Sequence, residues 1–396
     1  MKNKLILLTC LIVFQFISAQ ERVITTGVPF LLVAGDARSA GMADNGVATS
    51  ADVYSQQWNP AKYAFSVDQQ GFSVGYTPYL VELVNDISLS QITYFNKFRE
   101  RSSFAASIRY FSLGEIELRD NLEDQAVVVK PAEYALDLSY ALKLSDYFSM
   151  SVAGRFIRSN LRIPTAGTNS EAANSFAFDV SGFHQSEEMA FNSFNGKLRW
   201  GFNFQNLGPK INYDKSQGDA GSNFLPSNMK LGAGFDFILD DYNKVSVGLE
   251  VNKLLVPTPI EPEIIDLDGN GTIEAEEETA AQAQANIDYD KIGWVDGIFK
   301  SFNDAPDGFS EELKEFTYSV GAEYLYQDSF AMRLGYFNES PDKGARRFFS
   351  LGAGFKYNII KVDVSYLFSA SKVKNPLENT LRFSLSFAFG DKYDEY

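Results

Sequence analysis

Cysteine, histidine and long hydrophobic runs are nearly absent from this sequence. The only cysteine, Cys10, lies in an apolar N-terminal segment, so the rest of the chain has no thiol for a disulfide or a thiolate metal site. Beyond that segment no stretch of about eighteen consecutive apolar residues occurs, which excludes a membrane-spanning helix. Basic residues are in the minority, with 35 Lys and Arg against 51 Asp and Glu. This balance argues against a nucleic-acid partner.

The scarcity of histidine bears on enzymatic activity. His184 is the only histidine, and although Ser186 and Glu187 follow it closely, no strained nucleophile elbow surrounds them, as a Ser-His-Asp hydrolase would need. Asp and Glu are plentiful, but no pattern places a pair of them in an apolar pocket. We therefore expect no enzymatic activity and interpret His184 as a surface residue.

The N-terminus has the pattern of a secretory signal peptide. Lys2 and Lys4 precede an apolar run from Leu5 to Ile17, and small residues for cleavage follow at Ser18-Ala19-Gln20. We expect residues 1–19 to be removed and the mature chain to begin at Gln20. Export of a chain that lacks a membrane helix suits a barrel in an outer membrane.

The remainder of the chain is dominated by one repeated pattern. Segments of roughly ten residues alternate apolar and polar side chains and are rich in aromatics, as in transmembrane β-barrels. The segment nearest the C-terminus is the clearest, because Leu381, Phe383, Leu385, Phe387 and Phe389 share one face. About fourteen segments are centred near Val74, Leu89, Ala106, Leu138, Val152, Phe178, Trp200, Ala233, Leu249, Val320, Met332, Ala353, Val364 and Leu385. The pattern predicts an all-β protein, a transmembrane antiparallel β-barrel of about 14 strands within residues 69–396.

Short and long linkers alternate between these segments. The short ones lie at 98–101, 145–146, 240–243, 327–328 and 358, and the long ones at 114–131, 161–173, 207–225 and 256–314. Barrels with periplasmic turns and extracellular loops show this alternation, and Greek-key sandwiches do not. It predicts a multi-pass protein of the bacterial outer membrane with both termini in the periplasm. The long loop 256–314 would then be extracellular, and residues 257–312 of it hold 15 acidic residues against Lys291 and Lys300.

Charged residues that alternate with the apolar positions should face the lumen. They are Arg109, Asp137, Arg155, Asp179, Lys197, Arg199, Asp236, Glu250, Glu323, Arg333, Lys356, Asp363 and Arg382. Because both signs are present, the simplest interpretation is a network of ion pairs that holds the wall together. The second segment changes phase between Leu89 and Ile92, which indicates a bulge or a misplaced boundary.

About fifty residues, from Gln20 to Asp68, precede the first strand and lack the repeat. A barrel of fourteen strands has a lumen too wide to be filled by wall side chains alone, so we expect residues 20–68 to form a plug inside it. Within this segment stand Gly35-Asp36-Ala37-Arg38, Gly41, and Trp58-Asn59-Pro60-Ala61. The glycines permit tight backbone turns in a crowded lumen, and Pro60 restricts one φ angle.

The plug strings carry a family resemblance. The Asn59-Pro60-Ala61 tripeptide ahead of a fourteen-stranded barrel resembles the FadL family of outer-membrane transporters, whose N-terminus forms a hatch in the barrel. The longer string from Trp58 to Phe65, with the glycine-rich string before it, is similar to the PorV branch of that family, which serves the type IX secretion system of Bacteroidetes.

The resemblance implies a role in protein transport. Members of this branch associate with a very large translocon barrel of the SprA or Sov type, receive folded cargo by its C-terminal signal domain, and pass it to attachment proteins of the PorU type at the cell surface. Outer-membrane lipid would surround the barrel. No residues for cargo binding can be transferred, because they lie in variable extracellular loops.

The acidic loop contains one motif with metal chemistry. Residues 266–277 fit a twelve-residue calcium loop, with side-chain oxygens from Asp266, Asp268 and Asn270, a carbonyl from Thr272, Glu274 acting through water, and a bidentate Glu277. Gly271 stands where such a loop turns sharply. Prolines at 257, 259 and 262 preclude a regular incoming helix, whereas residues 276–285 suit an outgoing one. We expect a structural calcium ion there; the alternative is a solvated acidic loop that matches by chance.

Two other functions remain open at this stage. A FadL-like transporter for hydrophobic small molecules would need an apolar pocket in the lumen below the loops. A purely structural outer-membrane scaffold would need neither a pocket nor a cargo surface.

Overall fold

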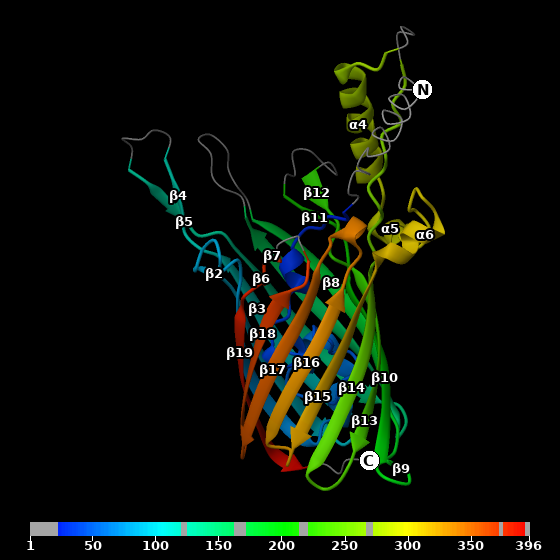
Figure 1. The fold of residues 1–396 in the computed structure, drawn as a ribbon. Coiled ribbons are helices and arrows are strands. Elements are labelled where there is room, and N and C mark those ends of the chain that lie inside the picture. The colour runs from blue at the N-terminus through cyan, green and yellow to red at the C-terminus, as the bar shows by residue number, and fades with distance from the viewer. Residues whose placement is uncertain are drawn as a thin grey trace, which may run out of the picture.

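The computed structural model describes residues 23–119, 125–161, 172–213, 221–266, 272–371 and 375–392. Over these residues the chain forms a closed antiparallel barrel of fourteen strands (Figure 1). The barrel strands are β1 (Asp68–Pro78), β2 (Ile87–Arg99), β3 (Ser102–Leu113), β6 (Ala132–Lys143), β7 (Phe148–Asn160), β8 (Ala173–Gln185), β10 (Asn195–Leu207), β13 (Asn228–Ile238), β14 (Asn243–Leu254), β15 (Phe316–Tyr326), β16 (Phe330–Asn338), β17 (Arg347–Tyr357), β18 (Ile360–Ser369) and β19 (Leu381–Lys392). Each expected strand centre lies within one of them, and β19 closes the barrel against β1.

The remaining elements lie inside the barrel or in its loops. Residues before β1 form η1 (Pro29–Leu32), α2 (Ala37–Ala40), α3 (Ser55–Trp58) and η2 (Pro60–Phe65). The linkers contain β4 (Ile116–Leu118), β5 (Val127–Val129), β9 (Met189–Ala190), β11 (Ile211–Asn212), β12 (Ser222–Asn223), α4 (Ala275–Asp290), α5 (Trp294–Lys300), α6 (Phe309–Glu312), η4 (Leu313–Glu315) and η5 (Pro341–Lys343). None of the described helices is both long and apolar enough to cross a bilayer.

The two ends of the barrel differ, as the linker pattern predicts. Short turns gather at one end and long loops at the other (Figure 1). The C-terminal strand ends among the short turns, where Lys392 pairs with Asp68. The prediction that both chain ends lie there is wrong for the N-terminal end of the described chain, because Val23 and Ile24 line a cavity with Leu254 and Thr317 beside the long loops. Since β1 starts at the short-turn end, the segment before it runs the length of the lumen.

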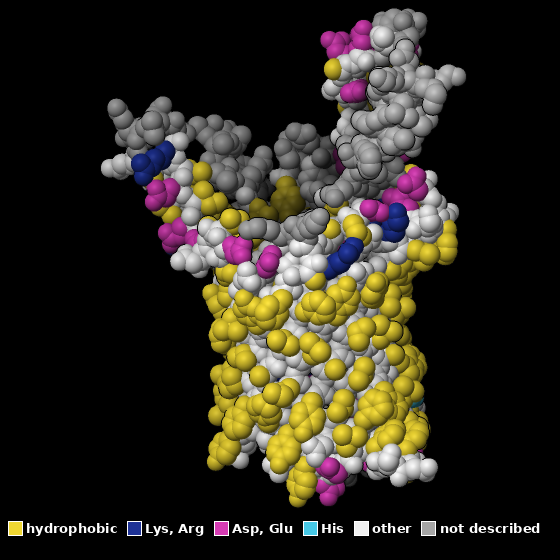
Figure 2. Space-filling model, viewed as in Figure 1, with side chains coloured by type: hydrophobic (Ala, Val, Ile, Leu, Met, Phe, Trp, Pro, Cys, Tyr) yellow, Lys and Arg dark blue, Asp and Glu magenta, His cyan; other side chains and the backbone are white. Residues whose placement is uncertain are grey.

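The wall has an apolar outside and a polar inside. Figure 2 shows hydrophobic side chains spread over the visible wall, with most charged side chains gathered above it. Leu138, at the middle of β6, is 69% exposed, whereas its neighbours Asp137 and Ser139 are buried. The charged residues expected to face the lumen are buried, apart from Lys356, which is half-buried near a short turn. The alternation therefore separates lipid from lumen, as in outer-membrane barrels.

The phase change in β2 has a different cause from the predicted bulge. Pairing with β3 is regular from Ile87 to Asn96, so Leu89 faces inward and Ile92 outward. Leu89 is fully buried against Val28, Phe30 and Leu31 of the N-terminal segment. An inward apolar residue is favourable here because the lumen holds protein instead of water.

The lipid-facing band leads to a prediction about stability. Replacing Leu138 with Arg places a charge near the bilayer midplane and should destabilise the barrel by about 2–4 kcal/mol. Leu144→Arg is the matched control: Leu144 is also half-exposed but follows β6 at the short-turn end, where the cost should be about 0–1 kcal/mol. Urea unfolding in lipid vesicles measures both, and equal losses would contradict the placement of the band.

Candidate functional site

The N-terminal segment fills the lumen and is called the plug here, residues 27–66. Most of its residues are buried, and Figure 1 shows it as blue ribbon within the barrel. Its short helices are too brief to be stable alone. They are held by hydrogen bonds to the inner wall, for example from the Ala37 amide to Ser384 Oγ at 2.7 Å and from the Ala43 amide to Ser350 Oγ at 2.8 Å.

Arg38 makes the central ionic contact between plug and wall. It donates to both carboxylate oxygens of Glu323 on β15, at 3.1 and 2.8 Å, and to Asp52 within the plug at 2.6 Å. Glu323 also accepts from Arg333 at 2.6 Å, and Arg333 pairs with Asp363 at 2.8 Å. Two arginines and three carboxylates thus form one buried network, in which each charge has an opposite partner.

The other plug residues singled out by sequence form a second cluster. Asp36 caps α2 by accepting from the Ser39 amide at 2.7 Å, and its other oxygen accepts from Trp58 Nε1 at 2.6 Å. Asn59 caps η2 through the Ala61 amide at 3.1 Å, and Pro60 occupies the first helical position. Asn59 Nδ2 also donates to the Gly182 carbonyl of β8 at 3.0 Å. These side chains therefore cap the short helices and anchor them to each other and to the wall.

Close backbone approach explains the glycines of the plug. A Cβ on Gly41 would lie 3.0 Å from the Cα of Gly352 on β17. A Cβ on Gly321 of β15 would lie 2.7 Å from Met42. Plug and wall therefore approach most closely where at least one of the two residues is glycine, and both are glycine at Gly41 and Gly352.

The wall carries ionic contacts of its own. Arg155 on β7 bridges Asp137 on β6 and Asp179 on β8, the latter at 2.9 Å, and Arg199 pairs with Asp236 between β10 and β13. These pairs confirm the expected network of ion pairs. Glu250 pairs with Lys230 at 3.6 Å and also accepts from the plug amides of Gly46 and Val47 at 2.8 and 2.9 Å, so part of the inward charge binds the plug.

A cavity of about 450 Å³ lies above the plug at the long-loop end. Its lining includes Lys230, Lys253 and Arg346 as well as Glu315 and Glu339. Trp58 of the plug also lines the cavity, and Lys230 Nζ lies 4.6 Å from the centre of its ring. The plug therefore forms the floor of the cavity. The apolar part of the lining comes mainly from the chain start and a few wall side chains, such as Pro29, Leu32 and Phe337.

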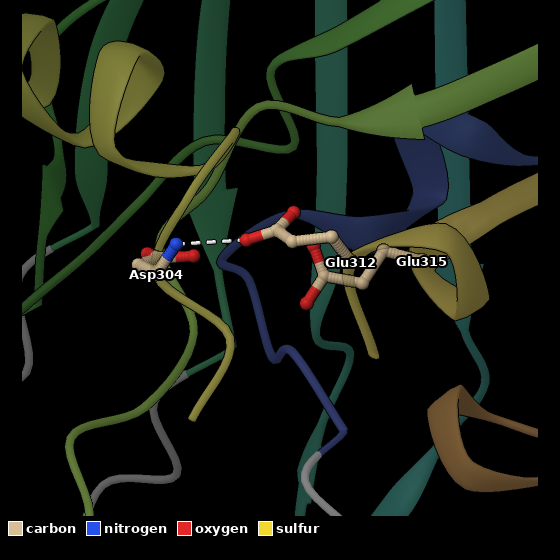
Figure 3. A group of neighbouring side chains, drawn as sticks. All are labelled: Asp304, Glu312 and Glu315. Carbon is tan, nitrogen blue, oxygen red and sulfur yellow. Dashed lines mark hydrogen bonds between the residues drawn. The ribbon is translucent and has the colours of Figure 1, made fainter. Parts of the chain in front are cut away.

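A group of acidic residues at the base of the long loop was missed by sequence reasoning. Asp304, Glu312 and Glu315 have carboxylate oxygens within 4.8 Å of one another (Figure 3). Lys253 pairs with Glu312 at 3.2 Å and Glu315 at 2.5 Å, and Lys343 with Glu311 at 2.7 Å and Glu315 at 3.0 Å. The only sequence signal is the spacing of Glu311, Glu312 and Glu315, which would place them on one side of a helical turn.

Burial and neighbouring charges both shift the pKa values of residues in this group. Burial, aided by the charge of Glu315, raises the pKa of Asp304, although hydrogen bonds from Thr258 act the other way. Burial also opposes the charge of Lys343, but Glu311 and Glu315 outweigh it and hold the pKa of its ammonium above the usual value. The two lysines thus offset part of the carboxylate charge and tie the loop to the barrel rim.

The expected calcium loop is described only in part. Asp268 and Asn270 lie outside the described residues, whereas Asp266, Thr272, Glu274 and Glu277 lie within them. The outgoing helix is α4, which begins at Ala275 with a capping box in which the Glu274 amide donates to Glu277 Oε2 at 3.1 Å. Residues 257–266 that precede the loop are not helical, as the prolines predict. Calcium binding stays a prediction.

His184 lies at the outer face of the wall near a short turn. Its ring stacks on Trp200 with centroids 5.3 Å apart. Ser186 Oγ donates to the Glu187 carbonyl, and the Glu187 carboxylate accepts from the Tyr147 hydroxyl. These side chains are occupied with local contacts, and the absence of enzymatic activity stays a prediction.

The Arg38 network leads to a prediction about the plug. Arg38→Ala leaves Asp52 without its arginine partner inside the barrel, and such a loss costs about 3–5 kcal/mol. Hydrogen exchange of amides in residues 36–52, measured in nanodiscs, should accelerate by about two orders of magnitude or more. Arg158→Ala, which removes an exposed arginine on β7, is the control and should leave exchange unchanged. Equal exchange in both variants would show that Arg38 does not hold the plug.

Comparison with solved structures finds two toluene transporters and a FadL homologue, all of low sequence identity and each with a TM-score below 0.5. The Pseudomonas putida toluene transporter TodX is 10% identical with a TM-score of 0.49, covering 89% of this chain and 98% of that one. A Pseudomonas aeruginosa FadL homologue is 13% identical with a TM-score of 0.44, covering 93% and 99%. The Ralstonia pickettii toluene transporter TbuX is 11% identical with a TM-score of 0.44, covering 89% and 96%. No curated protein matches the chain.

Comparison with protein families gives a specific match. The model for Type IX secretion system protein PorV matches residues 16–261. That range includes the whole plug, with the capping cluster of Asp36, Trp58 and Asn59, and the barrel strands from β1 to β14. More than half of the chain is covered, and the barrel architecture agrees with an outer-membrane location. The chain belongs to the family of the type IX secretion system protein PorV.

Proposed function

We propose that this protein carries cargo in type IX secretion. It would associate with the translocon barrel, bind the C-terminal signal domain of secreted proteins at its extracellular loops, and deliver them to the attachment machinery at the cell surface. The plug would keep the lumen closed while cargo is held outside.

One observation supports this proposal over a channel function: the plug is bonded to the wall along its length. Ser384 and Ser350, Glu323 and Glu250 all receive plug donors, and these residues lie on different strands around the barrel. Moving such a plug would expose several buried charges at once. A barrel built in this way suits a platform for proteins better than a pore.

The rival function, transport of hydrophobic small molecules, has less support. A site for such ligands is usually lined mainly by apolar and aromatic side chains with few polar groups. Here the cavity above the plug is lined by Lys230, Lys253, Lys343, Arg346, Asp44, Glu315 and Glu339 beside its apolar residues. A purely structural scaffold would not need the long loops at one end of the barrel, which contain their own strands and helices.

We also propose that calcium orders the tip of the acidic loop. Asp266, Asp268, Asn270, Thr272, Glu274 and Glu277 would supply the oxygen ligands. The start of α4 directly after Glu274 supports the proposal, since it holds two of these carboxylates beside each other. Binding would release Glu277 from its capping bond and direct it to the ion.

Deletion of the gene tests the secretory role. We expect proteins with type IX C-terminal domains to accumulate inside the cell or disappear from its surface, and a plasmid copy to restore them. Outer-membrane proteins that do not use this system serve as the control and should keep their normal levels. Normal display of cargo in the deletion strain would refute the proposal, and equal loss of both protein groups would favour the scaffold.

Calorimetry tests the calcium site. The purified protein should bind calcium with a dissociation constant on the order of 0.1–1 mM, as extracellular modules do. Glu277→Gln should abolish the binding heat, because it removes the charged bidentate ligand, yet Gln can still complete the capping box. Glu278→Gln, one residue further along α4, is the control. Retained heat in Glu277→Gln would exclude this loop as the site.

A further inference from the structure

The part of the long loop nearest the barrel rim exposes an unusual number of aromatic side chains. This part, residues 294–313, contains α5 and α6 and is called the rim lobe. Phe299 is 74% exposed and Phe309 is 77% exposed, with Val295, Phe302 and Leu313 also exposed. Exposed apolar residues that gather in one place usually mark a contact surface.

The exposed residues of α5 follow helical spacing. Val295 and Phe299 stand at i and i+4 of α5, so they form one stripe. Phe302 follows the helix, and its ring centre lies 5.9 Å from Nζ of the buried Lys253, so it belongs to the base of the lobe. Gly297 and Ser301 form the opposite, buried stripe, and a Cβ on Gly297 would lie 2.8 Å from the Phe224 ring. The helix therefore packs on the protein through its small residues and turns its large apolar residues outward, the reverse of a helix in a soluble domain.

The rim lobe is held in this orientation by polar contacts at its base. The amides of Asp304 and Ala305 donate to Glu312 Oε1 at 2.7 and 3.0 Å, and the Thr258 amide donates to Asp304 at 2.9 Å. Lys253, fully buried, pairs with Glu312 from the wall. These contacts hold α5 so that its apolar stripe faces outward.

The lobe is continuous with the lipid-facing surface of the barrel. Trp294 packs edge-on against Phe178, with centroids 6.4 Å apart. Phe178 faces outward on β8 and is opposite Leu207, the last residue of β10 at the long-loop end. Figure 1 shows α5 and α6 projecting outward at the rim, and Figure 2 shows hydrophobic side chains on this projection directly above the apolar band.

We propose that the rim lobe is a membrane-interface anchor that inserts its aromatic side chains into the boundary between lipid headgroups and acyl chains. Aromatic residues are favoured at this depth, and amphipathic helices lie along it with their apolar face down. The continuity from Phe178 through Trp294 to Phe299 identifies lipid as the occupant, because the same hydrocarbon that covers β8 reaches the lobe. The lobe fixes the base of the acidic loop against the membrane surface. This inference rests on the outer-membrane location and is independent of the secretory role.

Single-cysteine labelling tests the anchor, since the only cysteine of the sequence lies at position 10, within the predicted signal peptide. Phe299→Cys and Phe309→Cys carry an environment-sensitive fluorophore in nanodiscs that contain lipids with a nitroxide near the acyl carbonyl. Leu138→Cys, in the middle of the apolar band, is the positive control. Val127→Cys, exposed on the β5 strand of the β4–β5 hairpin, is the negative control.

Because the nitroxide lies at the depth proposed for the lobe, we expect quenching at 299 and 309 to equal or exceed that of position 138 and to exceed that of position 127. Quenching no greater than at position 127 would overturn the proposal and leave the patch to a protein partner. A second measurement uses the native Trp294: in a Trp200→Phe variant, with Trp58 buried in the plug, brominated lipids should quench its fluorescence. This measurement needs no substitution in the lobe itself. Unquenched Trp294 fluorescence in nanodiscs would contradict the anchor.

Discussion

The structure depends on pairing buried charges between the plug and the inner wall. Glu323 lies between Arg38 of the plug and Arg333 of the wall, with the shortest contacts at 2.8 and 2.6 Å. A charge left unpaired in such a place would cost several kcal/mol. A wall that lines its lumen with Glu250 and Glu323 can therefore close around protein more favourably when the protein brings matching donors. The plug supplies them through one arginine and a series of backbone amides.

This constraint links the fold to the function. A water-filled porin solvates its inward charges, so its lumen can stay open. Here Glu250 accepts from plug amides, and Gly41 touches Gly352 backbone to backbone. The barrel interior is thus a packed core, and the surface available for recognising other molecules lies at the long-loop end. That arrangement suits a family that serves protein secretion.

Sequence alone predicted the wall well because its pattern has a period of two and one face meets lipid. It placed the strand centres and the inward charges, and it singled out Arg38 and Asn59. The prediction failed where a residue contacts a part of the chain that is distant in sequence. Leu89 breaks the pattern because it packs on Leu31 of the plug, and the first described residues lie at the long-loop end because the plug runs the length of the lumen. The pairs of Lys253 and Lys343 with the loop carboxylates join positions about thirty to sixty residues apart in the chain, which no local pattern reveals.

The acidic loop combines two kinds of charge that composition cannot separate. At its base, Glu311, Glu312 and Glu315 are buried and paired with two lysines. On α4, Glu276 and Glu278 are exposed, and among the residues of that helix Ala285 alone is buried. A helix that is polar on nearly all sides gains little from packing, so α4 depends on its capping box and on the contacts of Tyr289 with Pro257 and Phe224 at its end. The loop therefore has a base that is paired with the barrel and an acidic arm that is exposed to solvent.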